Sequence, residues 1–561
     1  MRRIVSSLIL AVALATLGST QALSQPASAP APAARQPAAA PPRLVVAISV
    51  DQFSADLFAQ YRGNFTGGLA RMQEGAVFPS GYQSHAATET CPGHSTLLTG
   101  ARPARTGIIA NTWFQPGLAR ADKAVYCAED ETDPTSTPGN PVVSASHLRV
   151  PTLGDRLKAA FPASRNVAVS AKDRSAIMMG GHRIDAGYWW KGSGFTSFAG
   201  QDLSPAAQAE NRAVAAIVAK GGPAFAVPAW CAARQRSLQV GKAVIGGNRF
   251  ALPRGDVTGF RASPRLDAAT VDLAIRLSSE LSLGRGSATD VLSVGLSGTD
   301  TIGHAYGHQG LEMCIQLAEV DRAIGRLLAY LDSRKIDYVV VLTADHGGID
   351  APEGLQQQAY PRAVRVNEAL MPAALDKAVT AKTGITAGSG PLIYGDGANG
   401  DLYFSASLNP GEKARASAAL VTLLKPHPQV AAVFTAKELA EAPLPSASPQ
   451  DWSLKDRARA SFDPQRSGDV VVLLDRAVVP VPAANLSIAT THGSAWDYDR
   501  RVPILFWRRG MRGFEQPAPV ETVDIAPSLT AILGLKVPEG AFDGRCLDLD
   551  GGPENSCEAV K

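Results

Sequence analysis

Two pairs of acidic and histidine residues have the spacing of metal ligands. Asp300 and His304 are four residues apart, so on a helix both side chains would lie on the same face. Asp345 and His346 are adjacent, and a strand end or a turn can direct adjacent side chains toward one point, whereas a regular helix cannot. Carboxylate oxygens and imidazole nitrogens are ligands that zinc accepts. The two pairs therefore predict a metal centre.

Two further candidate ligands come from distant parts of the chain. Asp51 follows an apolar run close to the beginning of the chain, and His492 lies in a Thr-His-Gly sequence near its end. Together with the two pairs they make six protein ligands, enough for two zinc ions with three protein ligands each. Three protein ligands leave one position open on each ion, which is typical of catalytic zinc. We therefore predict two Zn2+ ions per chain.

Four apolar runs predict the buried strands that position these residues. They cover residues 44–50, 167–171, 291–297 and 338–344. Runs this rich in Val, Leu and Ala are typical of parallel strands that are covered on both faces. Between the last two runs, the segment 311–331 has apolar residues at helical spacing, which predicts a crossover helix.

The candidate functional residues lie where the predicted strands end. Asp51 follows the first strand, and Lys172 and Arg174 follow the second. Asp300 and Asp345 follow the third and the fourth. One acidic residue at a strand end is commonly a turn or cap residue, but charged residues at four strand ends indicate a site, because open α/β sheets bind ligands at that edge. We predict an α/β fold with a mostly parallel central sheet flanked by helices.

Two less regular stretches interrupt this pattern. Residues 350–487 are rich in Ala, Pro and Gly, and they separate His492 from the Asp345-His346 pair by well over a hundred residues. We predict that this stretch and residues 175–263 are insertions that form a cap over the sheet edge. Both would belong to one catalytic domain that covers residues 43–561.

Several short motifs follow one another in a characteristic order, and together they resemble the alkaline phosphatase superfamily. The motifs are Asp51, Thr90-Cys91-Pro92-Gly93-His94, Asp300-Thr-Ile-Gly-His304, Asp345-His346-Gly347 and Thr491-His492-Gly493. The resemblance is greatest to the monomeric bacterial alkaline phosphatases with a threonine nucleophile, which are related to the nucleotide pyrophosphatase/phosphodiesterases. It covers nearly the whole chain from 43 to about 547. Each motif alone is a weak signal, but the ordered set is highly specific.

The resemblance implies that Thr90 is the nucleophile and also contacts a metal ion. A threonine hydroxyl is a poor nucleophile at neutral pH, and metal coordination lowers its pKa. The implied reaction is zinc-dependent hydrolysis of phosphate monoesters through a phosphothreonine intermediate, which releases inorganic phosphate and an alcohol.

The resemblance also divides the ligands between the two zinc ions. In the resembled branch, the ion that holds the nucleophile is bound by residues matching Asp51, Asp345 and His346. The other ion is bound by residues matching Asp300, His304 and His492. His308 also follows Asp300 at a short distance, and the family pattern favours His304 over it. Two ions about 3.5–4 Å apart can stabilise both the attacking and the leaving oxygen of an in-line displacement.

Three polar residues are expected to hold the phosphoryl group. Lys172 and Arg174 are two residues apart after a predicted strand and can both point to one face. Arg174 can donate to two phosphate oxygens, while Lys172 adds a compact charge. Asn111 can donate its side-chain amide to another oxygen. In the resembled monoesterases, positions matching these three residues bind phosphate.

Other functions fit parts of this pattern. A nucleotide pyrophosphatase/phosphodiesterase would share the metals and Thr90, but a diester carries one negative charge fewer, so Lys172 and Arg174 would be less useful. A sulfatase needs a Cys/Ser-x-Pro-x-Arg motif, whereas Cys91 is followed directly by Pro92. A phosphoglycerate mutase relative would use a serine nucleophile in the cytosol. An exported zinc-binding protein without activity would leave Thr90 and the two cationic residues without a role.

The beginning of the chain predicts export. Two arginines precede an apolar run over residues 4–17, and residues 22–24 provide small side chains at the positions that a signal peptidase reads. We predict a signal peptide over residues 1–24 and an Ala/Pro-rich linker over residues 25–42, with the protein in the periplasm or secreted. The apolar run is short for a bilayer span, which takes roughly 20 residues, so we predict no stable membrane insertion.

Charge and cysteine content narrow the partners and the compartment. The 54 Lys and Arg residues nearly balance the 51 Asp and Glu residues, and a net charge of +3 does not favour nucleic-acid binding. Six cysteines permit disulfides in an exported protein. Cys546 and Cys557 lie close together in the sequence and are the preferred bridge. We expect a monomer that acts on small-molecule phosphate esters.

Overall fold

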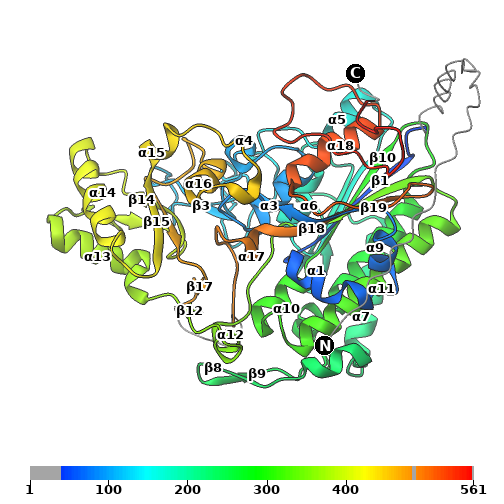
Figure 1. Ribbon diagram of the computed structural model, residues 1–561, viewed down its shortest axis with the longest axis horizontal. Helices are drawn as coiled ribbons and strands as arrows, with labels where there is room; N and C mark the ends of the chain where they lie inside the picture. The colour runs from blue at the N-terminus through cyan, green and yellow to red at the C-terminus, as the bar shows by residue number, and fades with distance from the viewer. Residues whose placement is uncertain (1–39, 483–487, 559–561) are drawn as a thin grey trace, which may run out of the picture. The chain divides into compact units, whose positions relative to one another are not determined.

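The computed structural model describes residues 40–482 and 488–558 (Figure 1). From Pro41 onward the chain forms one compact unit. The predicted signal peptide and most of the predicted linker lie outside the described residues. Among the helices of the described residues, none is both long enough and apolar enough to span a bilayer.

A ten-stranded sheet forms the centre of the unit. Its strands follow the order β19-β2-β18-β11-β1-β10-β5-β6-β7, and β20 pairs with β2. They are β1 (Leu44–Val50), β2 (Ala76–Tyr82), β5 (Asn166–Ser170), β6 (Ala186–Lys191), β7 (Gly194–Thr196), β10 (Asp290–Leu296), β11 (Tyr338–Thr343), β18 (Arg501–Arg508), β19 (Phe514–Glu515) and β20 (Val520–Glu521). The five central strands from β11 to β6 are all parallel. The predicted α/β fold with a mostly parallel sheet is confirmed.

The four strands predicted from apolar runs lie side by side as β11, β1, β10 and β5. β1, β10 and β11 begin at the same level of the sheet, because Leu44 of β1 pairs with Asp290 of β10 and with Tyr338 of β11, the first residues of these strands. At the other end, Val50 pairs with Leu296. The residues that follow these strands are therefore delivered to one edge of the sheet.

The two faces of β1 pack into different apolar cores, which explains why the whole strand is buried. Val46 and Ile48 belong to a core that also contains Leu317 of α11 (Leu311–Ser333). Val45 and Ala47 belong to a second core that contains Leu529 of α18 (Ile525–Ile532). Helices thus cover both faces of the sheet (Figure 1), and the predicted crossover helix is confirmed as α11.

Two strands that run antiparallel to each other bring distant segments to the same edge. β18 runs antiparallel to β11, so its amino end lies at the carboxyl end of β11. β2 runs antiparallel to β18, and its last residue, Tyr82, pairs with Arg501. The segment before β18, which contains His492, and the segment after β2, which contains Thr90, therefore reach the edge where the parallel strands end.

The two predicted insertions differ from each other. Residues 350–487 contain a separate four-stranded sheet of β13 (Ile393–Tyr394), β14 (Gly400–Phe404), β16 (Val470–Leu474) and β15 (Val430–Thr435). This small sheet has its own apolar core, which includes residues of α13 (Pro372–Thr383) and α14 (Pro410–Leu424). Within 175–263, β6 and β7 instead extend the central sheet, because β6 continues the parallel pairing of β5.

Three disulfides join the six cysteines. The predicted bridge between Cys546 and Cys557 is confirmed. The other two bridges, Cys91–Cys127 and Cys231–Cys314, join residues that are 36 and 83 positions apart. Disulfides persist in oxidising compartments, so three of them agree with the predicted export.

Candidate active site

Thr90 is the first residue of helix α3 (Thr90–Leu97) and is almost completely buried. Its hydroxyl Oγ1 lies 3.3 Å from Lys172 Nζ. The helix packs tightly against the end of β11, because a Cβ atom at Gly93 would lie 2.0 Å from the backbone oxygen of Asp345. The glycine of the Thr-Cys-Pro-Gly-His motif therefore lets the start of α3 approach the predicted ligands.

Asp51, Asp345 and His346 come together beside Thr90. Asp51 directly follows β1, and the other two follow β11. His346 Nε2 lies 3.5 Å from Asp51 Oδ1 and 3.4 Å from Asp345 Oδ2. Its other ring nitrogen, Nδ1, hydrogen-bonds the Gly347 carbonyl at 2.8 Å. That bond places the proton on Nδ1 and leaves the Nε2 lone pair directed at the two carboxylates.

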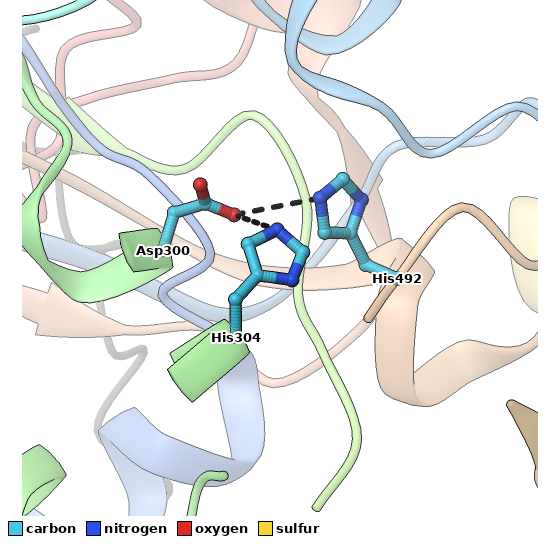
Figure 2. A group of neighbouring side chains, drawn as sticks. All are labelled: Asp300, His304 and His492. Atoms are coloured by element: carbon cyan, nitrogen blue, oxygen red, sulfur yellow. Dashed lines mark ion pairs between the residues drawn. The ribbon is translucent and has the colours of Figure 1, made fainter. Parts of the chain in front are cut away.

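Asp300, His304 and His492 form a second group (Figure 2). The first two lie on helix α10 (Gly298–Tyr306), and Asp300 Oδ1 is 3.1 Å from His304 Nε2 and 3.4 Å from His492 Nε2. Both histidines bind backbone carbonyls through Nδ1, His304 that of Thr490 at 2.9 Å and His492 that of Thr88 at 2.8 Å. A carbonyl on the far nitrogen is the usual way in which proteins orient a metal-binding histidine.

The two groups are neighbours. Asp51, Asp300 and His346 each offer a ligand atom within 4.8 Å of the others. The rings of His346 and His492 stack with their centroids 3.6 Å apart. His308, which competes with His304 in the sequence, instead contacts Gln52 Oε1 through Nε2 at 2.8 Å. The structure thus brings all six predicted ligands together and places His304, not His308, beside Asp300.

The pKa values of two of the carboxylates, Asp51 and Asp300, are strongly shifted. Burial raises the pKa of Asp51 well above its usual value, and the nearby Asp345 charge raises it further. Burial also acts to raise the pKa of Asp300, but His304 and Lys172 outweigh it and hold the pKa well below its usual range. Lys172 is the cation shared by this site, 2.5 Å from Asp51 Oδ2 and 2.7 Å from Asp300 Oδ2.

These residues fit a metal centre on their own chemistry. Asp51 Oδ1 and His346 Nε2 are buried without a hydrogen-bond partner among the described residues. Asp51, Asp300 and Asp345 converge on a single lysine, so their negative charge exceeds the positive charge beside them. Buried charges in proteins are paired or coordinate a metal, and carboxylate with imidazole nitrogen is a donor set that suits zinc.

The predicted phosphate-binding residues lie close to Thr90 and the candidate metal ligands. Lys172 caps helix α6 (Asp173–Gly180), and Arg174 lies in its first turn. The guanidinium nitrogen Nε of Arg174 is buried and has no hydrogen-bond partner among the described residues. Asn111 precedes β3 (Thr112–Phe114), and its Oδ1 accepts a hydrogen bond from the backbone N–H of Cys91, the neighbour of Thr90, at 2.8 Å.

Gln52 and His94 contact the candidate metal ligands, although neither was assigned a role in the sequence analysis. Gln52 Nε2 donates to Asp300 Oδ1 at 3.0 Å, and its backbone N–H donates to Asp345 Oδ1 at 3.2 Å. Its φ of 65° is a left-handed conformation that a residue other than glycine rarely adopts. His94 Nδ1 lies 3.1 Å from Asp345 Oδ2. In the sequence, Gln52 directly follows Asp51, and His94 is the last residue of the motif that begins at Thr90.

A pocket opens beside the nucleophile, between the β3 segment and the small sheet of the 350–487 region. Its lining includes Glu89, Thr112, Phe114, Tyr403 and Gly493. Glu89 and Gly493 are the chain neighbours of Thr90 and His492, so the pocket adjoins the cluster of candidate ligands. Burial raises the pKa of Glu89 to about 7.

The fold and the site together define an α/β enzyme with a metal cofactor at the carboxyl edge of its sheet. Residues 45–495 match the family described as type I phosphodiesterase / nucleotide pyrophosphatase, and the chain belongs to this family. It is an enzyme of the alkaline phosphatase superfamily.

Individual relatives cover nearly the whole chain. It is 51% identical over 528 residues to alkaline phosphatase PhoK of Sphingomonas sp, covering 93% of this chain and 94% of the relative. It is 48% identical over 518 residues to alkaline phosphatase PhoD of Zymomonas mobilis, covering 92% and 89%. The crystal structure of alkaline phosphatase PafA superposes with a TM-score of 0.78 at 25% identity, covering 91% of this chain and 99% of that one.

Proposed function

We propose that this chain is an alkaline phosphatase that hydrolyses phosphate monoesters at a two-zinc centre, with Thr90 as the nucleophile. The observation that carries the proposal is the convergence of three imidazole Nε2 atoms and three carboxylates on the start of helix α3. The printed names of the relatives at 51% and 48% identity support the activity. Inorganic phosphate and an alcohol are the products.

Following the family pattern, we assign the six ligands to two sets of three. Asp51, Asp345 and His346 would hold the zinc ion next to Thr90, and Asp300, His304 and His492 would hold the other; within each set the side chains lie close together. When bound, the two ions supply Lewis-acid stabilisation of the attacking and leaving oxygens. The backbone carbonyls on the histidine Nδ1 atoms keep each imidazole in the tautomer that can bind metal.

The reaction has two steps. Thr90 Oγ1 attacks phosphorus in line with the ester bond, which breaks and expels the alcohol, and the nucleophile becomes phosphothreonine. Water then attacks the phosphothreonine, releases inorganic phosphate and restores the hydroxyl. We assign the alcohol part of the ester to the pocket that Glu89 and Gly493 line.

The cationic groups favour a monoester over a diester. A monoester dianion offers more negative charge to Lys172 and Arg174 than a diester monoanion, and Asn111 donates to a third oxygen. The second candidate function is a phosphodiesterase that uses the same metals and nucleophile, because the matched family carries that description. The ratio of monoester to diester turnover by zinc-loaded protein separates the two.

The predicted export completes the proposal. The enzyme is exported by its signal peptide to the periplasm or the medium, where the three disulfides form. It acts there as a monomer.

Trapping the phosphoenzyme tests the nucleophile. Protein quenched with acid during turnover of an aryl phosphate should carry one phosphate on Thr90 by mass spectrometry. Thr90→Ala should carry none and lose activity by on the order of 10³-fold or more, whereas Thr90→Ser should still be labelled. Ser95→Ala is the matched control, because Ser95 Oγ donates to the Pro92 carbonyl at 2.7 Å. Phosphate retained by Thr90→Ala, or found on Ser95, contradicts the assignment.

A further inference from the structure

A short β-hairpin reaches several residues of the site at once. We call residues 111–127 the clamp hairpin, which contains β3 and β4 (Ala124–Tyr126). The two strands pair, with Thr112 opposite Tyr126, and the Cys127 backbone N–H donates to the Asn111 carbonyl at 2.9 Å. The two ends of the hairpin are therefore held together, and both lie next to the catalytic residues.

The first residue of the clamp hairpin, Asn111, forms hydrogen bonds with the residues on either side of the nucleophile. The backbone N–H of Asn111 donates to Glu89 Oε2 at 2.7 Å, and its side-chain Oδ1 accepts from the Cys91 backbone N–H at 2.8 Å. The Cys91–Cys127 disulfide joins the other end of the hairpin to the same point. Thr90 therefore lies between the two residues to which the hairpin is attached, Glu89 and Cys91.

The end of the clamp hairpin contacts the arginine of the proposed phosphate site. Tyr126 Oη donates to Asp173 Oδ1 at 2.5 Å. Arg174 Nη1 donates to Tyr126 Oη at 3.4 Å, and this is the one side-chain hydrogen bond of Arg174 within the described residues. Arg174 Nε has no such partner. Nη1 of the guanidinium is thus held by the Tyr126 hydroxyl, while Nε remains available to bind an anion.

The direction of these hydrogen bonds follows from the groups involved. An ionised Asp173 can only accept, so the Tyr126 hydroxyl must donate to it. The lone pairs of the hydroxyl then face Arg174, which can only donate. Burial raises the pKa of Tyr126 above its usual value, which keeps the hydroxyl protonated. Phenylalanine could fill the same space but could make neither bond.

We propose that Tyr126 is a positioning residue that orients the Arg174 guanidinium toward the phosphoryl group, with the clamp hairpin linking that orientation to the placement of Thr90. The proposal rests on the proposed role of Arg174 in phosphate binding. An arginine side chain loses considerable rotamer freedom when it is fixed, and a guanidinium that is already oriented loses less of it on binding phosphate. Tyr126 supplies that orientation before the substrate arrives.

The first test is Tyr126→Phe. We expect kcat/KM for an aryl phosphate to fall roughly three- to tenfold, the weight of one hydrogen bond. Inhibition by inorganic phosphate should weaken by the same factor, and turnover of an aryl alkyl phosphodiester should change less than twofold. An equal loss on both esters would overturn the proposal, because a general structural defect acts on both.

The chain offers a matched control. Tyr338 Oη donates to Asp332 Oδ1 at 3.1 Å, and Asp332 Oδ2 pairs with Arg71 Nη1 at 2.6 Å. This tyrosine, aspartate and arginine repeat the residue types of the site at the amino end of β11. Tyr338→Phe should leave kcat/KM and phosphate inhibition unchanged. A loss of monoester turnover equal to that of Tyr126→Phe would show that the effect is not specific to the site.

A double-mutant comparison with Arg174→Ala separates the two proposals. If Tyr126 acts through Arg174, Tyr126→Phe should add little once Arg174 is removed. Fully additive losses would overturn the positioning role while leaving the phosphate site intact. If Arg174→Ala itself leaves monoester turnover unchanged, the proposed phosphate-binding role of Arg174 fails instead. Asp173→Ala removes the acceptor of the Tyr126 hydroxyl without changing the hairpin and should reproduce the Tyr126→Phe ratio of monoester to diester losses.

Discussion

The two ends of the parallel strands carry similar polar residues with different surroundings. At the amino ends, Asp290 accepts hydrogen bonds from the backbone N–H groups of Arg165 and Gly284, each at 2.8 Å. Asp337 pairs with Arg508 at 2.7 Å. At the carboxyl ends, Asp51 Oδ1 is buried without a hydrogen-bond partner among the described residues.

Two arginines show the same contrast. Arg71, near the amino ends, donates two hydrogen bonds to Asp332 and lies 3.8 Å from the ring centroid of Trp507. Arg174, at the carboxyl ends, has one side-chain hydrogen bond and a buried, unpartnered Nε within the described residues. Satisfied polar groups stabilise a fold, whereas buried donors and acceptors left open need a ligand. The surroundings of these charged residues, and not their type, distinguish the carboxyl end of the sheet from its amino end.

Metal removal should produce the largest effect and should be confined to the carboxyl edge. A chelator should abolish turnover, and added zinc should restore it, with about two zinc ions per chain by elemental analysis. Circular dichroism should show that the helices and strands persist, because the amino ends of the sheet do not depend on metal. Full activity with one firmly bound ion would contradict the two-metal centre, whereas a third, structural ion would not.

Removal of the two cationic residues should have the next largest effect. Lys172→Ala with Arg174→Ala should lower monoester kcat/KM by on the order of 10²-fold or more, and diester kcat/KM far less. The single losses should not add, because both side chains hold one phosphoryl group. Arg71→Ala is the matched control and should lower the melting temperature while keeping the monoester to diester ratio. An equal fall on both esters would remove the main support for the monoesterase assignment.

The disulfides should separate activity from stability. Loss of either Cys91–Cys127 or Cys231–Cys314 should cost roughly 4 kcal/mol of stability by loop entropy, for spacings of 36 and 83 residues. Cys91→Ser with Cys127→Ser should also lower monoester turnover several-fold below the melting temperature, because this bridge adjoins Thr90. Cys231→Ser with Cys314→Ser should not. Kinetics at a temperature where both variants are folded provide the measurement, and equal activities would contradict the expectation.

The smallest effect is expected at the amino ends. Asp337→Asn removes the ion pair between Asp337 and Arg508. The side chain of Asp337 is 46% exposed. An exposed pair contributes at most about 1 kcal/mol, so the melting temperature should fall slightly and kcat/KM should not change. A marked loss of turnover or of bound zinc would show that the two ends of the sheet are coupled.

Much of the fold was predictable because the strands and the crossover helix have strong local signals. The runs that became β1, β5, β10 and β11 are continuously apolar, which reflects burial on both faces. β6 was missed and assigned to an insertion. Its sequence contains Tyr188, Trp189 and Trp190, and aromatic residues in a short run do not distinguish an edge of the main sheet from a separate cap.

Contacts around the site were less predictable than its members. The six candidate ligands were found from residue type, spacing and family pattern, and the structure brings them together. Gln52 was not found, since an amide side chain after a ligand has no distinctive signal. Tyr126 was not found either, because its partners Asp173 and Arg174 are more than forty residues away in the sequence.

The residue types and their order along the chain already indicate which chemistry the chain can perform. Asp51, Asp300 and Asp345 follow apolar strands, and that order depends on the local pattern alone. The way in which His492 and Thr90 reach these residues depends on the arrangement of the strands in the folded chain. The antiparallel placement of β18 and β2 turns the segments before and after these strands toward the carboxyl edge. Strand direction is set by long-range pairing in the sheet, and no local pattern of residues encodes it.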